Sequence, residues 1–136
     1  MLCLGRRSAG FVLFAVLAGL ILPAAASDTS FPFGSTLLLD VAPMQGSRRV
    51  PMIEIDENGA VAFHLWCANA LGTANVADDT ITIVPNRALP TQCTPDVLSR
   101  DAELLAELSQ VTGWRRHGDV VDFLGATPLR FRLMTN

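Results

Sequence analysis

The strongest alternation of apolar and polar positions in this chain runs from Met52 to Cys67. Ile53 and Ile55 alternate with Met52, Glu54 and Asp56. The segment Glu57-Asn58-Gly59 follows them. An Asn-Gly pair favours the positive φ angles of a tight hairpin turn. Because a period of two places alternate side chains on one face of a strand, this pattern predicts a β-hairpin with one buried face. The apolar positions that share this face after the turn are Val61, Phe63, Leu65 and Cys67.

Shorter runs of the same kind predict the remaining strands. Residues 70–75 are small and include a glycine, so this segment is interpreted as a link between strands. Pro85-Asn86 is expected to end a strand, and His117-Gly118-Asp119 is expected to turn the chain between two others. The predicted strands cover residues 36–41, 80–84, 114–116, 120–124 and 129–133.

A change of period predicts a helix after Cys93. Thr94 suits the N-cap, Pro95 suits the first helical position, and Gly113 is a natural C-terminal stop. Between them, apolar residues recur at spacings of three and four, which indicates an amphipathic helix lying on a sheet. The predicted apolar stripe consists of Leu98, Ala102, Leu105, Leu108 and Val111.

Together these elements predict an α+β domain. We expect a curved antiparallel sheet of about seven or eight short strands, half-barrel-like in shape, packed by one amphipathic helix. Residues 27–35 are expected to form an extended leader, and residues 36–134 a single domain.

The first 26 residues have the pattern of a secretory signal peptide. Arg6 and Arg7 precede a 12-residue apolar run at 11–22, and small residues at 24–26 provide a cleavage site before Ser27. The run is about half of the roughly 20 residues that span a bilayer core, so no stable membrane anchor is expected after cleavage. We therefore expect a periplasmic or secreted protein of a bacterium, exported by general secretion.

The net charge of the mature chain limits the classes of molecule that the protein is expected to bind. All ten basic residues are arginines, two of which lie in the predicted signal, so the mature chain carries 8 arginines against 13 acidic residues and a net charge of 8 − 13 = −5. Nucleic acids require a basic patch to neutralise their phosphates. An acidic chain of this kind is not expected to bind nucleic acid.

Two chemical interpretations of Cys67 are considered and set aside. A nucleophilic cysteine needs electropositive, partly exposed surroundings, whereas Cys67 is predicted on an apolar strand face. Structural zinc sites need closely spaced ligand pairs, which this chain lacks. We therefore expect no catalytic residue, no metal and no cofactor. The residues that these interpretations would combine are His64, Cys67, Asp78, Cys93 and His117.

A disulfide bond is the preferred interpretation of the cysteines. Cys3 lies ahead of the apolar run and should leave with the signal, so Cys67 and Cys93 remain as a pair in a small exported domain. Closing a loop of this length should stabilise the fold by about 3–3.5 kcal/mol in the chain-entropy model.

Two surface features are candidates for contact with a partner. Trp66 is predicted on the strand face opposite Phe63, where it either covers a second small core or marks a contact surface. Four arginines are interpreted as sharing the outer face of the last strands, either as solvated surface or as a site for an anionic partner. They are Arg115, Arg116, Arg130 and Arg132.

The order of these motifs resembles the META domain family, the HslJ-like small exported proteins, over roughly residues 34–133. The family's cysteine-containing hairpin end corresponds to residues 66–69, with Gly72 following at the fifth position after the cysteine. Trp66 stands where the family usually has glycine. The other matching segments are 80–84, 90–93, 101–111 and the Gly-Asp hairpin at 118–123.

The resemblance implies a fold and a general role. META domains are associated with the cell envelope, stress and drug tolerance, or with secretion and motility. We expect a non-enzymatic exported envelope module that is protein-binding or stress-related, with an unknown envelope protein as its partner. The alternatives are a small carrier of apolar ligands or lipids, suggested by the density of apolar residues, and an inhibitor of a cell-wall enzyme. The apolar residues behind the carrier hypothesis are Leu37, Leu39, Phe63, Leu65, Phe123 and Phe131.

Overall fold

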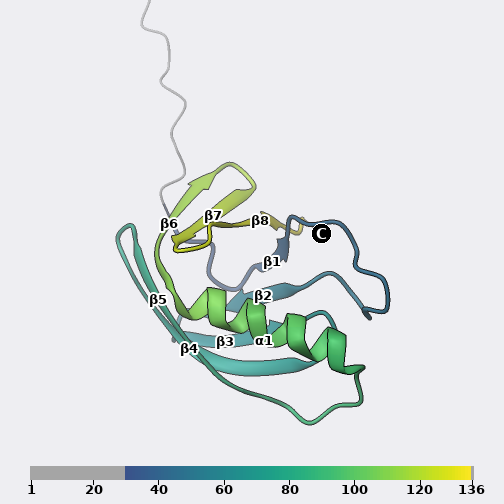
Figure 1. Cartoon of the computed structure of the whole chain (residues 1–136). Helices are drawn as coiled ribbons and strands as arrows, with labels where there is room; N and C mark the ends of the chain where they lie inside the picture. The colour runs from purple at the N-terminus through teal and green to yellow at the C-terminus, as the bar shows by residue number, and fades with distance from the viewer. Residues whose placement is uncertain (1–29, 136) are drawn as a thin grey trace, which may run out of the picture.

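The first and last strands of the chain pair with each other and close an antiparallel β-barrel of eight strands (Figure 1). The structure, a computed structural model, describes residues 30–135, so the predicted signal peptide of residues 1–26 lies outside the described residues. The elements are β1 (Thr36–Leu39), β2 (Met52–Ile55), β3 (Ala60–His64), β4 (Asn69–Ala77), β5 (Thr80–Ala88), α1 (Pro95–Ser109), β6 (Val111–His117), β7 (Val120–Gly125) and β8 (Leu129–Leu133).

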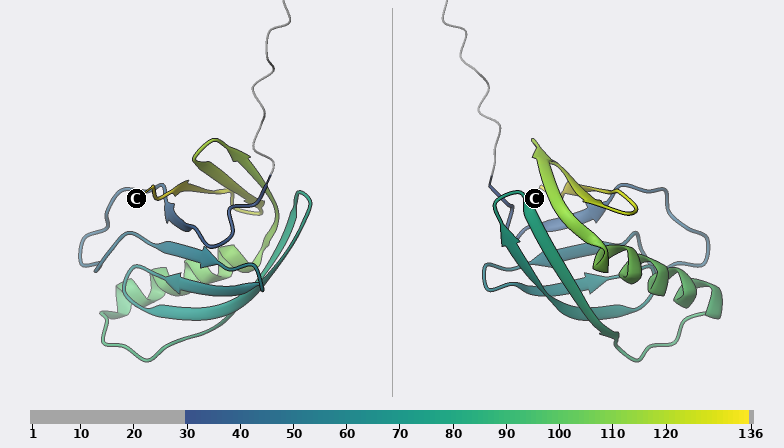
Figure 2. Two further views of the ribbon diagram at one scale, coloured as in Figure 1. Left: turned by 180° about the vertical axis from the view of Figure 1, so that it is seen from behind. Right: turned by 60° about the vertical axis from the view of Figure 1, so that its left-hand side comes forward.

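Closure of the barrel corrects the expected half-barrel. β1 pairs on one side with β2 and on the other with β8, where Leu37 lies opposite Leu133 and Leu39 opposite Phe131. At the other junction β5 meets β6 at Thr80 and Gly113. Figures 1 and 2 show the strands curving around a common interior, with α1 lying along one side. The predicted α+β class, with a curved antiparallel sheet and one helix, is confirmed.

The interior of the barrel is filled by the alternate apolar side chains of its strands. The buried face predicted for the β2–β3 hairpin is confirmed, since Phe63 and Val61 are fully buried. Phe123 and Phe131 pack with their ring centroids 5.0 Å apart. The six residues that suggested an apolar-ligand carrier all belong to this core, namely Leu37, Leu39, Phe63, Leu65, Phe123 and Phe131.

The segment expected to be an extended leader contributes to the core. Phe31 is buried, and its ring lies 5.0 Å from that of Trp114 in an edge-to-face arrangement. The chain then turns at Gly34, whose N–H donates to the carbonyl of Ile55. Because Phe31 packs inside the barrel, the domain begins before Thr36, earlier than its predicted boundary.

Helix α1 buries a stripe that shares Leu108 with the predicted one but is otherwise shifted by one residue. Its N-terminus is as expected, with Thr94 as N-cap and Pro95 in the first turn. The helix ends at Ser109, and Gly113 belongs to β6 instead of acting as the stop. Leu98 is exposed, and the stripe turned toward the barrel is Val97, Asp101, Leu104 and Leu108. The periodicity of apolar residues alone does not identify this stripe, because an aspartate occupies one of its buried positions.

The predicted link at residues 70–75 is wrong, because this segment is part of β4. Gly72 sits at a point where the neighbouring strands come too close for a side chain. A Cβ at Gly72 would lie 2.5 Å from the carbonyl oxygen of Val84 and 2.9 Å from the ring of Phe63. β5 also continues past Pro85, which lies opposite Gly72 beside a register shift.

Replacing Gly72 by alanine is expected to lower the free energy of unfolding by about 1–3 kcal/mol, because the added methyl group must displace backbone. Urea denaturation of Gly72→Ala would measure this loss. Thr73→Ala, an exposed change at the next position of the same strand, is the control and should stay within about 0.5 kcal/mol of the original protein. Equal stabilities for the two variants would show that β4 and β5 separate freely here.

Candidate functional site

The β3–β4 hairpin ends in a tight turn that carries Trp66 and Cys67. Leu65 and Ala68 flank the turn, and the N–H of Leu65 donates to the carbonyl of Ala68 at 2.9 Å. Residues 65–68 are called the hairpin tip below. Trp66 therefore lies at the end of a hairpin, where its side chain is half-buried.

A buried carboxylate from α1 holds the hairpin tip. Asp101 is 2% exposed, and its Oδ2 accepts the N–H of Ala68 at 2.8 Å. The N–H of Cys67 points at the same carboxylate, at 3.3 Å and 3.4 Å from its two oxygens. Hydrogen bonds from backbone N–H groups to an ionised carboxylate are stronger than those between neutral groups. Asp101 thus satisfies two buried donors that the tight turn leaves without a backbone partner.

The predicted disulfide between Cys67 and Cys93 is present and fixes the same tip from another side. It joins the turn to the loop just before α1, with the two Cα atoms 6.2 Å apart. Two arginines complete the attachment. Arg48 donates its backbone N–H to the carbonyl of Trp66 at 2.8 Å, and the guanidinium of Arg49 donates to the carbonyl of Cys67 at 2.8 Å.

The surroundings of Cys67 do not support a catalytic or a metal-binding role for this residue. Cys67 is bonded to Cys93, and the Nδ1 of His64 lies 3.3 Å from the side-chain oxygen of Asn69. His117 is exposed at the end of β6. Within residues 30–135, no group of three or more His, Cys, Asp or Glu side chains is placed to hold a metal ion.

Trp66 lines a groove of about 440 Å³ between α1, the loop after β1 and the start of β8. This hollow is called the tip groove below. Its apolar lining combines half-buried or exposed side chains, such as Val41 at 44% exposure, with parts of the core. The apolar residues of the groove are Leu39, Val41, Met44, Trp66, Leu104, Pro128 and Leu129, and the charged ones are Asp40, Arg100, Glu103, Glu107 and Arg130.

Most charges around the tip groove are paired within the protein. Arg100 and Glu103 form an ion pair of 3.0 Å on α1. Glu107, one turn further along the helix, is half-buried. Among residues 30–135, no hydrogen bond or ion pair joins the Glu107 carboxylate to another side chain.

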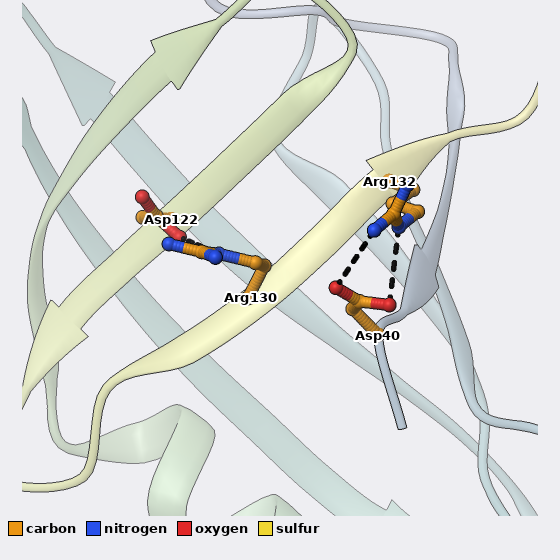
Figure 3. A network of polar contacts seen from close by, with 4 residues as sticks. All are labelled: Asp40, Asp122, Arg130 and Arg132. Atoms are coloured by element: carbon orange, nitrogen blue, oxygen red, sulfur yellow. Dashed lines mark hydrogen bonds and ion pairs between the residues drawn. The ribbon is translucent and has the colours of Figure 1, made fainter. Parts of the chain in front are cut away.

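The arginines of the last strands are largely neutralised by aspartates (Figure 3). Arg130 donates to Asp122 at 2.8 Å, and Arg132 donates to both oxygens of Asp40 at 3.1 Å and 3.3 Å. The hydrogen bond to its aspartate raises the pKa of each arginine above its ordinary value. Because both cations are already paired, this face offers an anionic partner less charge than its sequence suggests.

The four arginines do not share one face. Arg115 is exposed opposite Asp122, and Asp122 lies opposite Arg130, so charges of alternating sign cross the outer surface. Arg116 points the other way, donates its Nε to the carbonyl of Gly118 at 2.8 Å and reaches the carbonyl of Ser30 at 3.5 Å. The structure brings Trp66 and Arg130 together in the tip groove. Arg115 and Arg130 line a neighbouring hollow of about 480 Å³.

Removing one of these exposed arginines should have little effect on stability. Arg132→Gln is expected to leave the midpoint of thermal unfolding nearly unchanged, because exposed ion pairs gain little over hydration. Thermal unfolding at low and high salt would check this, since the small loss should shrink as salt screens the pair. A large, salt-independent fall in the unfolding midpoint would mean that Arg132 and Asp40 help to close the β1–β8 junction.

The comparisons with known proteins establish the fold class. No family model and no curated protein matches this chain. The NMR structure of a protein from Burkholderia xenovorans has a TM-score of 0.57 and 15% identity, and the match covers 85% of this chain and 98% of that one. Another protein solved by NMR has a TM-score of 0.56 and 12% identity, with coverage of 73% and 88%. At these identities the similarity concerns the fold alone, a small barrel domain with one helix.

The sequence alone indicates Trp66 and the disulfide, but it does not indicate the residues that make them a site. Asp101 was assigned to neither the core nor a functional role, although it falls in register with Val97, Leu104 and Leu108. An acidic residue inside an apolar stripe was the signal that could have revealed it. The tip groove had no comparable signal, because Val41, Met44 and Glu107 come from segments that only the fold brings together.

Proposed function

We propose that the protein is a non-enzymatic exported envelope module of the META type that binds a partner protein through the tip groove. The observation that carries this proposal is the position of Trp66. Its large aromatic side chain is half-buried in a groove, on a hairpin tip that is fixed from several sides. Half-buried aromatic residues in hollows are frequent anchors of protein–protein interfaces.

Rigidity of the hairpin tip supports a binding role. The tip is attached by the disulfide to Cys93, by the carboxylate of Asp101 and by the guanidinium of Arg49. A side chain that is already held in its binding position loses less entropy when a partner docks. The attachments therefore favour Trp66 as a preorganised contact.

The proposed location has two supports. The Cys67–Cys93 disulfide is compatible with an oxidising compartment, and the sequence of residues 1–26 has the signal-peptide pattern. Within the described residues, α1 is too short and too polar to cross a membrane. The META assignment is supported by the order of its motifs, since the segment at 66–69 covers most of the hairpin tip and the start of β4, and the segment at 118–123 falls on the β6–β7 hairpin.

The two alternative functions have weaker supports. The apolar residues that suggested a carrier pack against one another in the core, so their presence is explained without a ligand. An inhibitor would need an exposed loop that enters a cleft, and the exposed loop after β1 contributes Val41 and Met44 to the tip groove instead.

Affinity capture with matched variants tests the proposed function. Crosslinked complexes would be isolated from the source envelope with the original protein, with Trp66→Ala and with Leu71→Ala. Leu71 is the control because it is 52% exposed and lies on β4, outside the tip groove. We expect Trp66→Ala to lose a partner that Leu71→Ala retains. The same partners captured by all three proteins at similar thermal stability would contradict the proposal.

A further inference from the structure

We propose that the tip groove accepts a cationic side chain, a lysine or arginine of the partner protein, between Trp66 and Glu107. This inference rests on the proposed function and adds the chemistry of the partner. Trp66 and Glu107 line the same groove from different elements, the hairpin tip and α1. An aromatic face and a carboxylate are both attractive to a positive charge.

The pairing of charges selects a cation over an anion. Both arginines of the groove are occupied, Arg100 by Glu103 at 3.0 Å and Arg130 by Asp122 at 2.8 Å. Glu107 is half-buried, and nothing within residues 30–135 neutralises its carboxylate through an ion pair. The charged residues that line the groove are two arginines and three acids, which gives 2 − 3 = −1. An incoming anion would have to share an arginine with its internal carboxylate, whereas an incoming cation would meet the carboxylate of Glu107, which has no ion-pair partner within residues 30–135.

The apolar lining suits the hydrocarbon stem of such a side chain. Lysine and arginine bury their methylene groups on apolar surface while the charged end stays near water or a counter-ion. Met44 and Leu104 provide apolar surface in the groove beside Trp66. The groove therefore has separate features for the stem and for the charged end of one side chain.

Small model compounds allow the inference to be tested without knowing the partner. Nα-acetyl-lysine methylamide, its norleucine analogue and its glutamate analogue would be titrated into the mature protein, observed through the indole N–H signals by NMR. The chain has two tryptophans, Trp66 and Trp114. Trp114 is buried against Phe31 and serves as an internal control, and Trp66→Phe assigns the two signals.

The lysine compound is expected to shift the Trp66 signal, leave the Trp114 signal unmoved and bind about two- to fivefold more tightly than norleucine, the ratio expected of an exposed cation–π contact. Glu107→Gln should remove this preference, while Glu57→Gln, which alters an exposed carboxylate on the β2–β3 turn outside the groove, should preserve it. Equal binding of norleucine, tighter binding of glutamate, or no shift of Trp66 with lysine would overturn the inference. None of these results excludes the groove as a partner site, because that proposal is tested separately by the capture experiment with Trp66→Ala.

Discussion

Replacing Asp101 by alanine is expected to lower the free energy of unfolding by about 4 kcal/mol. The side chain is 2% exposed, and its carboxylate accepts from the backbone N–H groups of Cys67 and Ala68. Each buried donor left without an acceptor costs about 1–3 kcal/mol. Urea denaturation followed by tryptophan fluorescence would measure the loss.

Asp96→Ala is the matched control for this prediction. Asp96 belongs to the same helix but is exposed in its first turn, so its removal should cost only the favourable interaction with the helix dipole, about 0.3–1 kcal/mol. Similar losses for Asp96→Ala and Asp101→Ala would contradict the role assigned to the buried carboxylate. Asp101→Asn should fall between them, because the amide keeps one acceptor but brings donors toward the backbone N–H groups.

Removing the disulfide is expected to be the other large destabilisation. The double variant Cys67→Ala/Cys93→Ala should lose about 3.5 kcal/mol, because a bridge across 26 positions restricts the unfolded chain. Equilibrium unfolding of the variant and of the reduced original protein should give similar values. A loss below about 1 kcal/mol would show that the hairpin tip is held by Asp101 and the arginines alone.

The two attachments are expected to be coupled. Asp101 and the disulfide act on the same four residues, and neighbouring changes that share a structural element are seldom additive. Adding Asp101→Ala to the disulfide-free protein should therefore cost less than it does in the original protein. Strict additivity would mean that the tip keeps its position when either attachment is lost.

Local patterns predicted the parts of this fold that local sequence determines. Asn58-Gly59 and the alternation around it specify the β2–β3 hairpin, and the carboxylate of Asp56 supports the turn by accepting the N–H groups of Asn58 and Ala60. The disulfide was predictable for a different reason, since two cysteines in a small domain that is expected to be exported most often form a disulfide bond.

Long-range geometry decided the features that sequence reasoning missed. Pairing of β1 with β8 joins residues almost a whole domain apart, and no local pattern distinguishes a closed barrel from an open curved sheet. The sequence pattern predicts a link around Gly72, whereas the structure has a strand there. The reason for the glycine is the close approach of Val84 and Phe63, which leaves no room for a side chain and which the sequence alone does not reveal. The groove follows from this closure, which places α1 beside the start of β8.

Asp101 shows why the buried face of α1 differs from the predicted one. A polar residue on a helix is normally assigned to the exposed face, so the apolar stripe was drawn one residue away from its true position. The burial of this carboxylate is explained by the hairpin tip that packs against it, because two backbone N–H groups of the tip donate to its oxygens.

Photo-crosslinking from defined positions determines whether the tip groove is the contact surface. A photoreactive amino acid would be placed at Val41, which is 44% exposed in the groove, or at Leu71, which is 52% exposed on β4. If the partner docks in the tip groove, position 41 should give a partner adduct that disappears with Trp66→Ala, and position 71 should give none. An adduct formed from position 71 and absent from position 41 would contradict this docking site.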